Sequence, residues 1–197
     1  MRRIIVLFGA FAPLVAGNGR AQDTVEAIEA ARHGGVVIVC RHAITDHSQN
    51  EVEPVNYADS LTQRRLSEEG ESQSRALGHA LRALGIPIGE AVVSPMHRAL
   101  RTGELMLGSA TIDSIWHTNG GDYAGQPLER RRRVLATPPD SGNLFIISHI
   151  GTIGSVLPGT ADRLEEGDCI VVRPAAPGFD IVGIVPWQAW IRASGRS

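Results

Sequence analysis

The sequence predicts an α/β fold: a mostly parallel sheet covered by helices, with a β-hairpin near the C-terminus. Two short apolar runs, residues 36–40 and 144–147, have the length and the β-branched residues of strands buried on both faces. Segments with helical spacing of apolar residues alternate with them, which is typical of parallel strands joined by crossover helices. Residues 169–172 and 181–185, joined through Pro174–Gly178, predict the hairpin.

Helix starts and stops support this order of elements. Ser67 is expected to cap a helix that Gly85 ends, and Ser94 is expected to cap the next, with Pro95 at its first position. Residues 41–66 are long, polar and aperiodic, which predicts a functional loop. The expected helices cover residues 23–33, 68–84, 95–107, 127–135 and 153–157 and a segment around Trp187 and Trp190; short strands are expected at 91–93 and 111–116.

Composition excludes several classes of protein. The chain has 197 residues, of which 43% are hydrophobic and 20% charged, with a net charge of −2, so neither disorder nor a polybasic nucleic-acid surface is indicated. All 19 basic residues are arginines, which excludes Schiff-base chemistry and a Gly-Lys-Ser/Thr phosphate loop. The arginine run 130–133 is interpreted as a solvated helix face.

The N-terminus has the features of a signal peptide. Arg2 and Arg3 precede the apolar run 4–16, and Gly19-Arg20-Ala21 places a cleavage site before Gln22. The run is too short to span a bilayer, so no stable membrane anchor is expected. We therefore predict a signal peptide at residues 1–21, a single domain at 22–197, and a periplasmic or secreted location.

Two cysteines leave the disulfide question open. Export would permit Cys40 and Cys169 to pair. Cys40 lies inside a predicted central strand, however, where a free cysteine is a common small hydrophobic residue, and this interpretation is favoured.

Three predicted strands end in polar residues. Residues 36–40 lead into Arg41 and His42, residues 91–93 lead into Ser94 with Arg98 shortly after, and residues 144–147 lead into Ser148 and His149. The carboxyl ends of parallel strands meet at one edge of a sheet, where ligands bind. These side chains are therefore expected to form one site.

This set of residues suits a phosphoryl group. Arginine forks match phosphate oxygens, a helix N-terminus adds N–H groups, and a histidine can carry a phosphoryl group. The set is cationic and indicates an anionic substrate rather than a divalent metal. A Cys-x5-Arg phosphatase motif fails at Asp46, and neither a Gly-x-Ser-x-Gly elbow nor zinc-type spacing is present. The remaining histidines, at 33, 47, 79, 97 and 117, are expected to be structural.

Four motifs in order resemble the histidine phosphatase superfamily, the phosphoglycerate mutase-like fold. The resemblance spans roughly residues 35–157, which is most of the chain after the predicted cleavage site, and it implies a three-layer α/β/α sandwich. The motifs are Arg41-His42-Ala43, Leu66-Ser67-Glu68-Glu69-Gly70 with Gln73, Ser94-Pro95-Met96-His97-Arg98-Ala99 with Thr102, and Ser148-His149.

The resemblance implies a role for each matching position and no metal or cofactor. His42 matches the nucleophile that becomes phosphohistidine, Arg41 and Arg98 match the phosphate-binding arginines, and His149 matches the histidine that stabilises the transition state. Ser94 and Thr45 are expected to contribute to substrate binding.

Two positions depart from the family pattern. Ala43 stands where the family usually has glycine, and Ile150 stands where one branch has its acidic proton donor. Asp46 is the favoured candidate for the general acid, with Glu104 and Asp122 as alternatives.

The sequence thus predicts a phosphomonoester hydrolase that acts through phosphohistidine. The alternative is a catalytically weak or inactive protein of the same fold that binds phospho-ligands. The expected partner is a small-molecule or peptide-borne phosphate ester and not nucleic acid. A mutase is less favoured because mutases act on cytosolic metabolites, and residues 44–65 and 118–126 are expected to shape the pocket.

Overall fold

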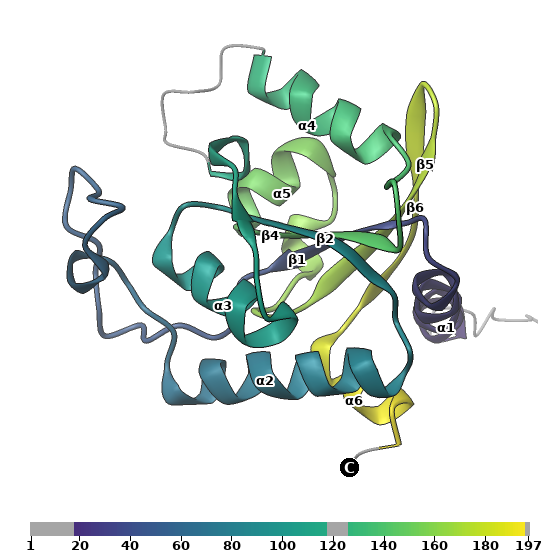
Figure 1. The fold of residues 1–197 in the computed structure, drawn as a ribbon, viewed down its shortest axis with the longest axis horizontal. Helices are drawn as coiled ribbons and strands as arrows, with labels where there is room; N and C mark the ends of the chain where they lie inside the picture. The colour runs from purple at the N-terminus through teal and green to yellow at the C-terminus, as the bar shows by residue number, and fades with distance from the viewer. Residues whose placement is uncertain (1–17, 118–125, 196–197) are drawn as a thin grey trace, which may run out of the picture.

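The computed structural model describes residues 18–117 and 126–195 (Figure 1). The strands are β1 (Val37–Arg41), β2 (Ile88–Val93), β3 (Thr111–Ile112), β4 (Asn143–Ser148), β5 (Cys169–Ala175) and β6 (Gly178–Val185). The α-helices are α1 (Asn18–His33), α2 (Glu68–Ala83), α3 (His97–Leu107), α4 (Gln126–Ala136), α5 (Ile150–Val156) and α6 (Trp187–Ala193). Short 3₁₀ helices lie at Ser60–Thr62, Ser114–Trp116 and Ala161–Arg163.

All six strands form one sheet in the order β3-β2-β4-β1-β5-β6. The first four are parallel, whereas β5 is antiparallel to both β1 and β6. Every residue of β4 and the first four of β1 are buried, because these central strands have a helical layer on each face. The mostly parallel sheet with a C-terminal hairpin is confirmed.

Helices cover both faces of the sheet (Figure 1). Alternate residues of β1 point to opposite faces, so Val37 and Val39 enter one core while Ile38 and Cys40 enter the other. The first core includes residues of α4 and α5, and the second includes residues of α1, α2, α3 and α6. The three-layer α/β/α architecture expected from the family resemblance is therefore present.

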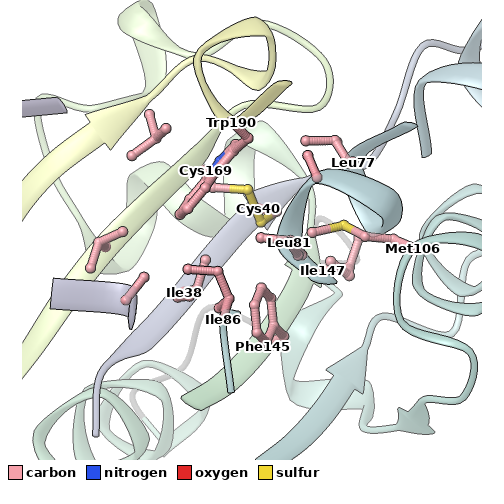
Figure 2. Close-up of a cluster of buried hydrophobic side chains, with 14 of the residues drawn as sticks. Ile38, Cys40, Leu77, Leu81, Ile86, Met106, Phe145, Ile147, Cys169 and Trp190 are labelled. Carbon is pink, nitrogen blue, oxygen red and sulfur yellow. A yellow bond between two sulfur atoms is a disulfide. The ribbon is translucent and has the colours of Figure 1, made fainter. Parts of the chain in front are cut away.

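A disulfide lies in the second core. Cys40 of β1 and Cys169 of β5 are directly paired across the antiparallel strands and are joined by a bond between their sulfur atoms (Figure 2). The sequence favoured a free Cys40, and this interpretation was wrong. It failed because the residue that faces Cys40 is set by the register of β5, which local sequence does not reveal.

Other differences concern element boundaries. Helix α3 begins at His97 with Met96 as its N-cap, so Ser94 does not cap it. The expected strand 111–116 is only two residues long and continues as the 3₁₀ helix Ser114–Trp116. The arginine run on α4 is not wholly solvated, since Arg131 is buried and its Nε donates to the carbonyl of Ile115.

The proposed signal peptide falls largely outside the described residues, which begin at residue 18. Helix α1 continues through the expected cleavage site before Gln22. Its buried residues Ala27, Ile28 and Ala31 all follow that site. Among the described residues, no helix is both long enough and apolar enough to cross a membrane.

Candidate active site

Two neighbouring parallel strands deliver the two histidines. Arg41 of β1 is in register with Ser148 of β4, so His42 and His149 are the next residues along each strand. The N–H of His42 donates to the carbonyl of Ser148 at 3.0 Å, which continues the sheet pairing to the edge of the site. The two imidazole rings have their centroids 5.3 Å apart. The two histidines therefore lie together at the carboxyl ends of the parallel strands, as expected from the sequence.

A hydrogen bond at one ring nitrogen orients the imidazole of His42 and leaves its other nitrogen unprotonated. Its Nδ1 lies 2.9 Å from the carbonyl oxygen of Ala43. A carbonyl can only accept, so the geometry assigns the proton to Nδ1 and leaves the lone pair on Nε2. Burial lowers the pKa of His42 to about 3, and the positive charges of Arg98, Arg41 and Arg64 act in the same direction. His42 is therefore neutral at physiological pH, the form that can act as a nucleophile.

His149 is also buried and neutral. Burial lowers the pKa of His149 well below its ordinary value, with further contributions from His42, Arg98 and His117. Its Nε2 lies 2.7 Å from the hydroxyl of Ser94, which is itself fully buried. Nδ1 of His149 is buried and has no hydrogen-bond partner among the described residues. Ser94 thus orients the ring of His149, and Nδ1 remains free to bind a ligand.

Two arginines flank the histidines. The guanidinium of Arg41 donates from Nη1 to the carbonyl of Leu164 at 2.9 Å and lies 3.5 Å from Oε1 of Glu166. Arg98, on the first turn of α3, forms an ion pair with Glu51 from the long loop. The Nε atoms of both arginines are buried without a hydrogen-bond partner among the described residues. Each arginine therefore keeps a donor that an anion could use.

Glu166 organises the other side of the site. Its carboxylate accepts hydrogen bonds from the N–H of Thr45 at 3.3 Å and from the Thr45 hydroxyl at 3.0 Å. The same carboxylate lies 3.3 Å from Nε2 of His47. Thr45, predicted to bind substrate, is 2% exposed and is engaged with Glu166.

The carboxylate of Asp46, the favoured candidate for the general acid, forms hydrogen bonds within its own turn. Oδ1 of Asp46 accepts hydrogen bonds from the Ser48 hydroxyl at 2.7 Å and from the Ser48 N–H at 3.0 Å, and these bonds lower the pKa of Asp46. Glu104 lies on the exposed part of α3 and pairs with Arg101 at 3.4 Å. Asp122 lies outside the described residues. In the structure Asp46 is thus engaged by Ser48, and Glu104 by Arg101.

Ala43 fits its position without strain. Among the described residues only glycines have positive φ, so this turn does not require glycine. The N–H of Ala43 donates to the hydroxyl of Thr102 at 3.0 Å, while its carbonyl holds His42. The methyl group is fully buried. The departure from the family pattern is thus compatible with the observed position of His42.

The second motif supports the loop that leaves His42. The carbonyl of Ile44 accepts from the N–H of Ser67 at 3.0 Å, and a side chain at Gly70 would place its Cβ 1.9 Å from that carbonyl oxygen. Gln73 accepts from the N–H of Ile44 at 3.0 Å and donates to the carbonyl of Glu166 at 2.8 Å. This motif therefore joins α2 to both walls of the site.

Sequence reasoning missed several groups at the site. Glu51 and Arg64 come from the aperiodic loop, where no spacing marks them. Glu166 precedes β5, and the antiparallel direction of β5 brings this residue to the carboxyl end of β1. The predicted hairpin could have revealed Glu166. A strand that runs antiparallel to β1 begins beside the carboxyl end of β1, where the site lies.

Comparison with known proteins supports the family resemblance. The model of the histidine phosphatase superfamily (branch 1) matches residues 37–134, from the start of β1 to α4. Residues 37–134 belong to branch 1 of the histidine phosphatase superfamily. A segment of 65 residues is also 38% identical to a 2,3-bisphosphoglycerate-dependent phosphoglycerate mutase of Caulobacter sp. (strain K31). That match covers 30% of this chain and spans only 27% of the mutase.

Solved structures support the same fold. The protein histidine phosphatase SixA complexed with tungstate is similar with a TM-score of 0.57 and 20% identity, over 78% of this chain and 97% of that one. A phosphoserine phosphatase mutant of Entamoeba histolytica in complex with phosphoserine is similar with a TM-score of 0.54 and 13% identity, over 78% of this chain and 98% of that one. At these identities the likeness establishes the architecture of the fold alone.

Proposed function

We propose that this chain is a phosphomonoesterase that forms a phosphohistidine on Nε2 of His42. The observation that carries the proposal is the state of His42: a buried, neutral imidazole with Nδ1 bonded to Ala43 and with Arg41 and Arg98 nearby. An unprotonated nitrogen beside two guanidinium groups is the arrangement that attack on a phosphoryl group requires.

The site residues suggest how the reaction proceeds. The phosphoryl oxygens bind Arg41 and Arg98, and the Nδ1 proton of His149 donates to one of them. Nε2 of His42 attacks phosphorus, and the bond to the leaving oxygen breaks as that oxygen takes up a proton. Water then attacks phosphorus, the P–N bond breaks, and inorganic phosphate leaves. The arginines compensate the charge of the phosphoryl oxygens, which is the main requirement of phosphoryl transfer.

Trapping of the intermediate tests this proposal. Wild type is mixed with an aryl phosphate labelled with ³²P, quenched in base and tested for an acid-labile, base-stable phosphoenzyme. His42→Ala is expected to lose both the phosphoenzyme and turnover. The exposed His79→Ala, on α2, is the matched control. An active His42→Ala variant with a normal phosphoenzyme would refute the nucleophile.

A second candidate is a protein that binds phosphorylated ligands with little or no turnover. The ion pair of Glu51 with Arg98 favours it, because this carboxylate competes with a bound phosphoryl group. A panel of three kinds of phosphorylated compound separates the two functions: phosphorylated serine, histidine-phosphorylated peptide and simple aryl esters. Binding of phosphate without hydrolysis of any member would favour the second candidate.

We also propose that the protein is exported. The basic and apolar residues before Gln22 support this, and so does the disulfide, since such bonds persist in oxidising compartments. Removal of residues 1–21 would retain the packing of Ala27, Ile28 and Ala31. Mass spectrometry of the protein from the periplasm is expected to find a chain that begins at Gln22. A full-length chain confined to the cytoplasm would refute export.

A further inference from the structure

A third imidazole lies at the site. His117 directly follows the 3₁₀ helix Ser114–Trp116, and its ring centroid is 5.3 Å from that of His149, at an interplanar angle of 79°. His117 is half-buried, whereas His42 and His149 are buried. From sequence it was expected to be a structural histidine. Its contact with His149 instead places a third imidazole, a side chain that can both donate and accept a proton, next to the proposed phosphoryl site.

The strand that carries His149 also fixes the position of His117. The hydroxyl of Ser148 donates to the carbonyl of Trp116 at 2.6 Å, and the Trp116 side chain is buried. The N–H of His117 donates to the carbonyl of Ser114 at 3.1 Å. The ring of Tyr57, from the long loop, stands edge-on to His117 with centroids 5.8 Å apart. The ring of His117 thus lies between the loop and His149.

The carboxylates near the site have other partners. Asp46 accepts hydrogen bonds from Ser48, Glu51 is paired with Arg98, and Glu166 binds Thr45 and lies beside Arg41. Each of these carboxylates is thus engaged by another residue of the protein. The leaving oxygen of a phosphate ester needs a proton as the P–O bond breaks.

The direction of attack selects the group that can supply it. In an in-line displacement the leaving oxygen departs on the side of phosphorus opposite to Nε2 of His42. His42 and His117 both contact the ring of His149, and within the described residues no ring contact joins His42 to His117. A phosphoryl group beside His42 and His149 can therefore direct its leaving oxygen towards His117.

We propose that His117 is the general acid of the reaction, an inference that rests on the proposed phosphatase function. Protonated His117 gives its ring proton to the leaving oxygen as the P–O bond breaks. The neutral ring then takes a proton from the water that attacks phosphohistidine, which restores His117 and releases phosphate. In this role an imidazole gives the proton that a carboxylic acid could otherwise give.

The dependence of the rate on the leaving group tests His117. Single-turnover rates of phosphoenzyme formation are measured for 2,4-dinitrophenyl, phenyl and alkyl phosphates in wild type and His117→Gln. A dinitrophenolate leaves without a proton, so its rate is expected to change less than about threefold, whereas the alkyl ester is expected to slow by about 10²-fold or more. A merely structural role would slow all three esters alike.

Controls separate this inference from the proposed function. His79→Gln removes an exposed imidazole from α2 and is expected to behave as wild type. Thermal melting and binding of inorganic phosphate check that His117→Gln is folded with an intact anion site. Three results would overturn the role of His117 and leave the proposed phosphatase function standing. They are an equal loss of rate for all three esters in His117→Gln, no loss for any of them, or a selective loss for the alkyl ester in Asp122→Asn instead. A wild-type protein that forms no phosphoenzyme with any ester would overturn both proposals.

Discussion

The buried neutral state of His42 predicts how the stability of the protein depends on pH. A histidine in the unfolded chain has a pKa of 6.5, whereas burial lowers the pKa of native His42 to about 3. Between these values the unfolded chain binds a proton that the native protein does not. The free energy of unfolding therefore falls as the pH falls, by about 1.4 kcal/mol per pH unit for this one group.

The perturbation that isolates this effect is His42→Gln, which keeps a polar side chain but removes the titrating ring. Between pH 7.5 and pH 4.5, wild type is expected to lose about 2 to 3 kcal/mol more stability than the variant. The stabilising contribution of neutral His42 is complete above pH 6.5 and is lost towards its native pKa of about 3. Other acid-sensitive groups, including His149, remain in both proteins, so their effects largely cancel in the difference.

Urea unfolding followed by tryptophan fluorescence, at pH 7.5, 5.5 and 4.5, measures this difference. The exposed His79→Gln variant controls for the loss of an imidazole as such. A difference between wild type and His42→Gln that stays constant with pH would refute the reasoning, since it would mean that native His42 is protonated as readily as in the unfolded chain.

Three further variants test the surroundings of His42. Glu51→Gln removes the carboxylate partner of Arg98, so calorimetry is expected to show phosphate binding tighter by about threefold to tenfold; unchanged or weaker binding would contradict competition. Cys40→Ala/Cys169→Ala opens a link across 129 residues, which is expected to cost about 2 to 5 kcal/mol in urea unfolding; an unchanged midpoint would argue against the bond. Ala43→Gly is expected to keep kcat within about twofold and to destabilise by about 0.5–1 kcal/mol; a large gain in activity would show that alanine strains the turn.

The elements that carry the two histidines were predictable from sequence for a physical reason. Strands β1 and β4 are buried on both faces, so nearly every residue must be apolar and the polar residue that ends each run stands out. Parallel direction then places His42 and His149 at one edge. The fold and the meeting of these two residues follow from these few positions.

The carboxylates were not predictable in this way. Glu51 reaches Arg98 from an irregular loop, where position depends on turns and tertiary contacts rather than on a period. Asp46 was favoured because it is near His42 in sequence, yet its carboxylate turns back to Ser48. Ser94 has the residue type of a helix cap, but the helix starts three residues later, at His97, and the hydroxyl of Ser94 is used by His149. Local propensity cannot distinguish these competing partners.

The register of β1 with β4 limits which parts of the site amino-acid substitutions can alter. Neighbouring strands are about 4.8 Å apart, and the rings of His42 and His149 are separated by 5.3 Å, a similar distance. The separation of the two imidazoles is thus set mainly by backbone hydrogen bonds, which side-chain substitutions elsewhere do not alter. The exposed part of the loop between residues 46 and 65 can be replaced, lengthened or recharged while this spacing persists. The spacing of the two imidazoles and the surface beside them are therefore determined by different parts of the chain.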